Sequence, residues 1–452
     1  MISRYLMSRS ISRLLALFGC FLIAQSAAAQ LESQRVAASA FLDALFARHW
    51  QRVEALEHRT MREQMPRERW AEMLDGLESK GGAFERHAFY SAEKNGSYAN
   101  IVHHVHFAKD SIGVRVVVDS LNLVGGFWFE PIKREYRFPP PPYADTTSFT
   151  EIPLTLNEGG DYPLDAILAR PNGDGPFPAV VLVHGSGPSD RDETIGGNKV
   201  FRDIAWGLAS RGVMVLRYDK RTQVYGRKMN IRTLTVQNET IDDAVTALKL
   251  LRGRPDTDTS RLILLGHSLG AGLAPEIAAT AGGVDGVVML APFARPLEVV
   301  IGDQLRFIAS QQDTLTGEEE IKLQNELDKA AKIRDGELMD SKMLLGVPAT
   351  YYYDLQLRNQ KTFAQELNVP FFIARGSKDY QTPEMEILLW KEWLAGRDDV
   401  VFRRYEDCYH LFIETDATPG PWNYQQEGHV ILSLIDDLAT WCKTFHLPEQ
   451  TE

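Results

Sequence analysis

Apolar residues recur at helical spacing near the start of the chain and alternate with polar residues further on. The apolar positions from about 31 to 56 predict one helix, and a second helical segment follows at about 67–77. After Gly81-Gly82 the period shortens to two, which is typical of half-buried antiparallel strands. These strands are expected at 87–91, 98–107, 111–121 and 126–129. The order of helices and strands predicts a small α+β domain over residues 31–138.

The pattern changes again from about residue 148, where apolar strands alternate with helical segments. Several of these strands are continuous apolar runs, which indicates parallel strands buried on both faces. Strands are expected at 151–156, 163–169, 179–184, 213–219, 261–266, 286–291, 370–376 and 400–406, and helices at 201–211, 240–251, 269–280, 385–394 and 430–444. The alternation predicts a doubly wound, mostly parallel, eight-stranded α/β domain over residues 148–452.

Two segments interrupt these patterns. The four prolines at 139–142 fit neither a helix nor an inner strand, so they predict a stiff linker at 139–147. Residues from about 293 to 350 are charged and helix-prone, and they are too many for a plain connection. We therefore expect an inserted helical cap over the strand ends, with a solvated surface excursion as the alternative.

The first thirty residues have the order of a secretory signal peptide. Arg4, Arg9 and Arg13 precede a short apolar run, and Ala27-Ala28-Ala29 offers a small-residue cleavage site. This order predicts export to the periplasm or the outside of the cell. A lipoprotein-type box ending at Cys20 is the weaker alternative, because that cysteine lies inside the apolar run. Later apolar runs have the length of strands, so no membrane-spanning helix is expected after cleavage.

The chain has a formal net charge of -12, with 44% hydrophobic and 24% charged residues. The acidic balance argues against nucleic acid or an anionic membrane as the main partner. Two cysteines, Cys408 and Cys442, lie beyond the predicted leader. In an oxidising compartment they could form a disulfide, but two separate thiols are equally compatible with the sequence.

The run Gly266-His267-Ser268-Leu269-Gly270 carries the strongest chemical signal. It follows a buried strand and precedes a helix of small residues, which is the context of a nucleophile elbow. The two glycines are needed because a Cβ there would meet neighbouring backbone. Ser268 is therefore the predicted nucleophile, and the amide of Leu269 is the predicted first donor of an oxyanion hole.

A serine nucleophile needs a histidine base and an acid that orients the histidine. Asp379 follows the strand at 370–376, and His410 follows the next strand, which is the order this elbow requires. Taken alone, Asp379 could cap a helix and His410 could be a structural histidine. Together with Ser268 they predict a catalytic triad, and Asp407 is the reserve candidate for the acid.

The second oxyanion donor is expected after the strand at 179–184. There the chain reads His184-Gly185-Ser186, and the amide of Ser186 is our candidate, although a plain glycine turn would give the same sequence. The polar segments 190–193 and 219–221 lie at nearby strand ends. They could bind a polar substrate or, as we prefer, form internal ion pairs.

Other candidate sites are weaker. His104 and His106 share a strand face, but no third ligand with recognisable spacing lies nearby, so we predict no metal site. Tyr351, in the tyrosine run 351–353, and Tyr380 are candidates for substrate contact. Packing in the core is an equal alternative for Tyr351.

The chain resembles a bacterial α/β-hydrolase family of secreted, esterase-like proteins in which a small domain precedes the hydrolase. The likeness rests on segments 184–188, 217–222, 266–270, 376–380 and 409–412. It implies a serine esterase without a cofactor and an N-terminal domain of the nuclear-transport-factor type. Cys408, so near the base, departs from the family pattern and leaves redox sensitivity of that loop open.

The predicted activity is hydrolysis of small or medium carboxylic esters through an acyl-enzyme. An aminopeptidase-like serine peptidase is the alternative within the enzymes, and it would need an acidic group such as Glu318–Glu320 to hold a substrate ammonium. A catalytically silent binding protein is the alternative outside them. The physiological substrate and the oligomeric state do not follow from the sequence.

Overall fold

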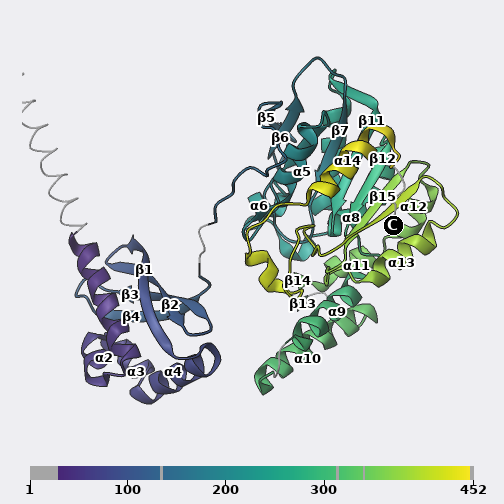
Figure 1. Ribbon diagram of the computed structural model, residues 1–452. Coiled ribbons are helices and arrows are strands. Elements are labelled where there is room, and N and C mark those ends of the chain that lie inside the picture. Colours follow the sequence, from purple (N-terminus) through teal and green to yellow (C-terminus); the bar gives the residue numbers. More distant parts are fainter. Residues whose placement is uncertain (1–28, 133–135, 312–314, 340–341, 448–452) are drawn as a thin grey trace, which may run out of the picture. The chain divides into compact units, whose positions relative to one another are not determined.

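The computed structural model describes residues 29–132, 136–311, 315–339 and 342–447. The chain divides into two compact units, Met1–Glu135 and Tyr136–Glu452 (Figure 1). The predicted signal peptide lies almost wholly outside the described residues. Within the described part of the chain, no helix has both the length and the apolar composition needed to cross a bilayer.

The N-terminal unit begins with helices, as the sequence predicted, but the first helix is broken. Residues 29–46 are helical, and α2 (Trp50–Leu56) starts after a turn at Arg48, whose φ is 56°. The continuous helix predicted for 31–56 is therefore wrong, because Arg48 takes the left-handed conformation that ends a helix. Two further helices follow, α3 (Arg59–Gln64) and α4 (Arg67–Gly81).

Four antiparallel strands complete this unit, in the order β1-β2-β3-β4. Their bounds are Phe84–Asn95, Tyr98–Phe107, Ser111–Val118 and Val124–Glu130. Along β2 alternate residues are buried, so His103 faces the core while His104 and His106 lie on the other face. There His104 stacks on Tyr90 and His106 bonds to Ser111, so the two histidines serve separate contacts. The predicted α+β domain is confirmed.

The second unit is built on an eight-stranded sheet in the order β16-β15-β12-β11-β7-β10-β6-β5. The strands are β5 (Phe149–Leu156), β6 (Leu164–Pro171), β7 (Phe177–Val183), β10 (Met214–Tyr218), β11 (Thr257–His267), β12 (Gly286–Leu290), β15 (Phe371–Gly376) and β16 (Val400–Tyr405). Six neighbouring strands are parallel to one another: β16, β15, β12, β11, β7 and β10. Strand β6 runs antiparallel to β10, and β5 runs antiparallel to β6. The predicted mostly parallel sheet is confirmed.

Helices cover both faces of this sheet (Figure 1). Along β7, Val180 and Leu182 face the core with α5 and α14, while Val181 and Val183 face the core with α7 and α8. The continuous apolar run in the sequence has this cause, since both faces of the strand are buried. These helices are α5 (Val200–Ala209), α7 (Asp242–Arg252), α8 (Leu269–Ala281), α13 (Glu384–Trp393) and α14 (Leu432–Thr444).

The segment predicted to be a cap forms two helices and a short hairpin. The helices are α9 (Leu297–Ser310) and α10 (Gly317–Arg334), and the hairpin pairs β13 (Met343–Leu344) with β14 (Val347–Pro348). Helix α11 (Ala349–Gln356) follows directly and carries the tyrosine run. A small core that includes Ile301, Ile333 and Tyr352 holds α9, α10 and α11 together.

The residues predicted to form a stiff linker belong to the second unit. The side chain of Arg202 donates to the carbonyls of Phe138 (3.0 Å) and Pro139 (2.8 Å), and Pro141 is buried. The compact units separate before Tyr136, so the linker at 139–147 was placed too late. Proline carbonyls are good acceptors, and α5 supplies the donor that fixes this segment on the hydrolase unit.

Both cysteines of the second unit are buried free thiols. Burial raises the pKa of Cys408 and of Cys442 to about 12. Of the two alternatives left open by the sequence, separate thiols are therefore the one found.

Candidate active site

Ser268 occupies a sharp turn between the central strand β11 and helix α8. Its φ is 52° and its ψ is -112°, a conformation that costs a non-glycine residue about 1–3 kcal/mol. The flanking glycines permit the turn. A Cβ on Gly266 would lie 2.2 Å from the oxygen of Gly270, and a Cβ on Gly270 would lie 2.3 Å from the oxygen of Val183. The chain therefore forms the nucleophile elbow that its sequence predicted.

Asp379 and His410 come together from the loops after β15 and β16. Oδ2 of Asp379 accepts a hydrogen bond from Nδ1 of His410 at 2.8 Å, and both side chains are buried. The ring of His410 packs against His267, with 4.8 Å between ring centroids, which brings it to the residue before Ser268. The structure thus brings the predicted acid and base into contact beside the elbow.

Asp379 is held in one orientation by its own loop. Oδ1 accepts from the amides of Gln381 (2.8 Å) and Thr382 (3.1 Å), and Oδ2 also accepts from the hydroxyl of Thr382 (2.5 Å). Burial alone would raise the pKa of Asp379, but His410 and the bonds from Thr382 lower it below its ordinary value. The carboxylate therefore stays ionised and can fix the tautomer of His410.

Asp407, the reserve acid, has a different role. Its carboxylate is mostly exposed and pairs with Lys378 at 2.9 Å. It takes no part in the contact with His410.

The loop after β7 carries the second oxyanion candidate. Ser186 lines the same cavity as Ser268, and its amide has no acceptor among the described residues. A Cβ on Gly185 would lie 3.2 Å from Cβ of Ser268, so this loop runs directly beside Ser268. Leu269, the other predicted donor, is the first residue of α8, where backbone amides have no partner in the helix.

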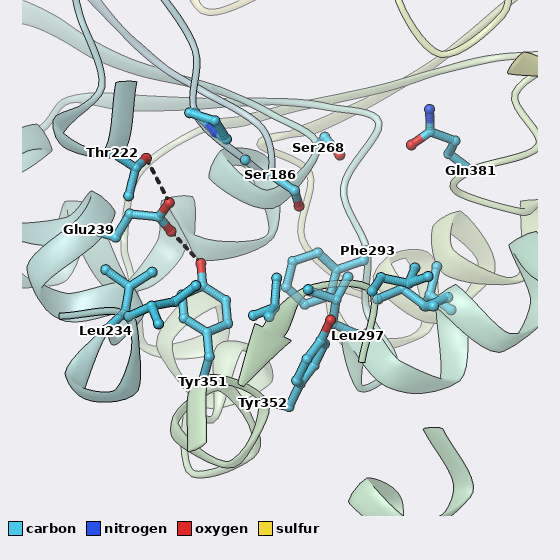
Figure 2. A pocket seen from close by; sticks show the side chains of 18 of the residues that line it. Ser186, Thr222, Leu234, Glu239, Ser268, Phe293, Leu297, Tyr351, Tyr352 and Gln381 are labelled. Carbon is cyan, nitrogen blue, oxygen red and sulfur yellow. Dashed lines mark hydrogen bonds between the residues drawn. The ribbon is translucent and has the colours of Figure 1, made fainter. Parts of the chain in front are cut away.

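The cavity in front of Ser268 has a volume of about 570 Å³ (Figure 2). Its apolar side chains come mainly from the cap and from residues that follow β12. Its one carboxylate among the described residues is Glu239, which lies to one side with Tyr351 and Thr222. The lining includes Met229, Ile231, Leu234, Phe293, Leu297, Val300, Ile301, Leu345, Val347, Tyr352 and Gln381.

The two tyrosines predicted to contact substrate differ. Tyr351 lines the cavity and donates its hydroxyl to Oε2 of Glu239 at 2.5 Å. Tyr380 is not among the lining residues, because its ring stacks on Phe307 with 5.2 Å between centroids. Gln381, the next residue, reaches the cavity in its place, so the prediction for Tyr380 was wrong.

The polar segments 190–193 and 219–221 form ion pairs inside the fold. Arg191 binds Asp219 through two nitrogens, at 3.0 and 2.9 Å, and Asp192 pairs with Arg217 at 2.9 Å. These pairs tie the loop after β7 to the end of β10. Of the two interpretations of these segments, the internal network is the one found.

Two buried residues, Glu193 and Lys220, make contacts at this loop that were not predicted. Glu193 accepts from the amide of Gly185 at 2.9 Å and pairs with His267 at 3.0 Å. Lys220 donates from Nζ to the carbonyl of Gly185 at 2.9 Å. No signal in the sequence separates these two residues from their charged neighbours, which form ordinary ion pairs.

Comparisons with known proteins agree with this geometry. A family model described as serine aminopeptidase, S33, matches residues 175–416, more than half of the 452 residues. Among curated proteins, the chain is similar to Esterase EstD of Thermotoga maritima, with 43% identity over 336 residues, 74% of this chain and 77% of that protein.

Similar solved structures include an esterase of Pyrobaculum calidifontis, with 20% identity, a TM-score of 0.40 and coverage of 65% of this chain and 85% of that one. Another is Est1E of Butyrivibrio proteoclasticus, with 15% identity, a TM-score of 0.42 and coverage of 65% and 96%.

The extent of the family match and the identity to the Thermotoga protein confirm the family that the motifs predicted. The match spans the elbow, the acid and base loops and the six parallel strands of the sheet, but it begins after β5 and β6. The chain is a hydrolase that belongs to the serine aminopeptidase S33 family of α/β-hydrolases.

Proposed function

We propose that the protein is a serine carboxylesterase in which Ser268, His410 and Asp379 form the catalytic triad. The observation that carries this proposal is the buried hydrogen bond between Asp379 and His410, beside a serine on a strained elbow that faces a cavity. This combination orients a base and exposes a nucleophile without any cofactor.

The reaction follows from these positions. Oγ of Ser268 attacks the ester carbonyl while Nε2 of His410 takes its proton, and the amides of Leu269 and Ser186 stabilise the oxyanion. His410 then returns the proton to the alcohol as the carbon–oxygen bond breaks. Water, activated by the same histidine, releases the acid from the acyl-enzyme. Asp379 stays ionised throughout and stabilises the imidazolium.

The cavity favours an ester over a peptide with a free amino terminus. The acidic run 318–320 belongs to the first turn of α10, where Glu318 pairs with Lys322 and Glu319 caps the helix through Thr316. None of these glutamates lines the cavity. Glu239 does line it, but Lys220 lies 3.3 Å away, so its charge is already compensated. A substrate ammonium would therefore lack an available carboxylate among the described lining residues.

The lining also indicates the type of ester. Aliphatic and aromatic side chains surround most of the space, and a volume of about 570 Å³ matches a small or medium molecule. We therefore propose esters with an apolar acyl or alcohol part. The similarity to Esterase EstD supports an ester as the substrate.

The test is the initial rate of hydrolysis of p-nitrophenyl esters from acetate to laurate, with Ser268→Ala as the matched variant. We expect turnover by the wild type and a loss of at least about 10³-fold in the variant. Equal rates for the two proteins would overturn the role of Ser268. Faster hydrolysis of aminoacyl amides than of any ester would favour the peptidase.

We also propose that the protein is exported to the periplasm or secreted. The basic, apolar and small-residue order of the first thirty residues supports this location. Cell fractionation followed by mass spectrometry of the N-terminus tests it. We expect a chain that starts near Gln30 outside the cytoplasm, and an intact N-terminus in the cytoplasm would contradict the proposal.

A further inference from the structure

The peptide bond between Gly185 and Ser186 is held by a lysine side chain. Its carbonyl oxygen, which belongs to Gly185, accepts from Nζ of Lys220 at 2.9 Å. Its N–H belongs to Ser186, which lines the cavity with Ser268. The carbonyl and the N–H of a trans peptide point in opposite directions because the unit is planar. A donor fixed on the oxygen therefore fixes the direction of the Ser186 N–H.

Lys220 holds this loop at a second point. Its own backbone amide donates to the carbonyl of Ser189 at 3.0 Å. The residue thus contacts both ends of segment 185–189, and its position at the end of β10 ties the loop to the rigid sheet. Because the loop passes beside Ser268, a small rotation of its peptides would change the distance from the donor to the reacting oxygen.

The charge on Lys220 is buried and compensated. Its side chain is 2% exposed, and Nζ lies 3.3 Å from Oε1 of Glu239. That carboxylate also accepts from Thr222 (3.0 Å) and Tyr351 (2.5 Å), two residues of the cavity wall. Burial of an ammonium group is unfavourable, so a neutral donor would hold a carbonyl at a lower cost in stability. A cation on the carbonyl additionally polarises the peptide and strengthens its N–H as a donor.

We propose that Lys220 is a positioning residue for the oxyanion hole, which aims and polarises the Ser186 N–H by holding the Gly185 carbonyl. The inference rests on the proposed esterase function and adds to it. Lys220 does not touch the substrate. Through Glu239 it also joins the oxyanion loop to Tyr351 in the substrate cavity, so the two parts of the site share one buried ion pair.

The experiment compares Lys220→Met with the wild type on a p-nitrophenyl ester that the wild type hydrolyses. We expect kcat to fall about 10- to 100-fold, which is no more than the fall in kcat when a whole oxyanion donor is removed. KM should change less than about threefold. An alkyl trifluoromethyl ketone gives the second readout. Ser268 adds to its carbonyl and leaves an oxyanion in the hole, so its inhibition constant should rise by the same factor as kcat falls.

A second variant also removes the charge of Glu239, which Lys220→Met leaves without its partner. In Lys220→Met/Glu239→Gln no carboxylate is stranded, which favours a folded protein if the single variant fails. The same loss in kcat and in ketone affinity is expected. Lys329→Met is the matched control, because it removes a lysine paired with Glu326 on α10, away from the loop, and both readouts should keep wild-type values.

The outcomes separate the two proposals. If wild type shows no esterase activity, the proposed function fails before the role of Lys220 is tested. If wild type is active and the folded double variant keeps its kcat and its ketone affinity, the role of Lys220 is wrong and the esterase stands. A lower melting temperature with unchanged kinetics would likewise mean that Lys220 only stabilises the fold.

Discussion

Glu193 and His267 form a buried ion pair, with 3.0 Å between Oε2 and Nδ1, which joins the loop after β7 to the elbow. On its other side, Nε2 of His267 donates to the carbonyl of His410 at 3.0 Å. Burial would lower the pKa of His267, but Glu193 raises it above its ordinary value. Burial would raise the pKa of Glu193, but His267 lowers it. The pair is therefore charged, and together with the bond to His410 it connects three loops of the site.

Glu193→Gln should destabilise the protein by about 3–5 kcal/mol, the usual cost of removing one partner of a buried pair. The raised histidine pKa gives stability that is lost as pH rises through the folded value, and the lowered glutamate pKa gives stability that is lost as pH falls. The difference in the free energy of unfolding between wild type and Glu193→Gln should thus be largest between about pH 4.5 and 6.5, where both groups of the pair are charged. Urea unfolding of both proteins across pH 4–9 measures it, and a difference independent of pH would contradict the charged pair.

Asp379→Asn should lower kcat by about 10³- to 10⁴-fold, as the corresponding change does in serine proteases. The amides of Gln381 and Thr382 keep Oδ1 in place, so the new NH2 group would face Nδ1 of His410 and favour the wrong tautomer. Asp407→Asn is the matched control, because that carboxylate is exposed and only pairs with Lys378. Ester hydrolysis checks both, and a similar loss in the two variants would refute the assignment of the acid.

Gly270→Ala should prevent stable folding or strongly lower the melting temperature. Its Cβ would lie 2.3 Å from the oxygen of Val183 and 2.7 Å from that of His184, and both are backbone atoms that cannot move away cheaply. Gly253→Ala is the control, since its Cβ would meet only ordinary contacts at 3.5 Å and its φ is -77°. Thermal unfolding compares them. Equal melting temperatures would show that the elbow tolerates a side chain.

Leu297→Trp should shift the ester preference toward short acyl chains. Leu297 lines the cavity at the start of α9, so a larger ring there removes volume next to the substrate. We expect kcat/KM for laurate to fall at least about tenfold while the value for acetate stays within about threefold. Leu357→Trp, at a position 86% exposed, should leave the profile unchanged. If the dependence of kcat/KM on acyl-chain length is unaltered in Leu297→Trp, the acyl chain does not bind beside Leu297.

The parts of the fold that follow local rules were predictable. The central strands of the sheet could be located because burial on both faces leaves continuous apolar runs, as in Val180–Val183. The elbow could be located because its G-x-S-x-G pattern lies between an apolar strand and a helix of small residues, although the contact that requires Gly270 comes from the distant Val183. Asp379 and His410 followed from their positions after the next strands.

The parts that depend on distant contacts were not predictable. Lys220 and Gly185 are far apart in sequence, and so are Glu193 and His267, so charge patterns alone could not pair them. The break at Arg48 interrupts an otherwise regular helical pattern. Tyr380 was a candidate for substrate contact, but its ring stacks on Phe307, a contact that the sequence does not reveal.

The attachment of the proline segment to α5 has a consequence for how this gene could be rearranged. Tyr136, Phe138 and Pro139 form hydrogen bonds with other residues of the hydrolase unit. The segment from Tyr136 to Pro139 is therefore an N-terminal part of that unit. Recombination that exchanged the first domain for another would preserve the enzyme when the crossover falls before codon 136. A crossover after the prolines would leave the guanidinium of Arg202 without its two carbonyls. The domain boundary at which the chain can be divided therefore lies before the proline segment, not within it.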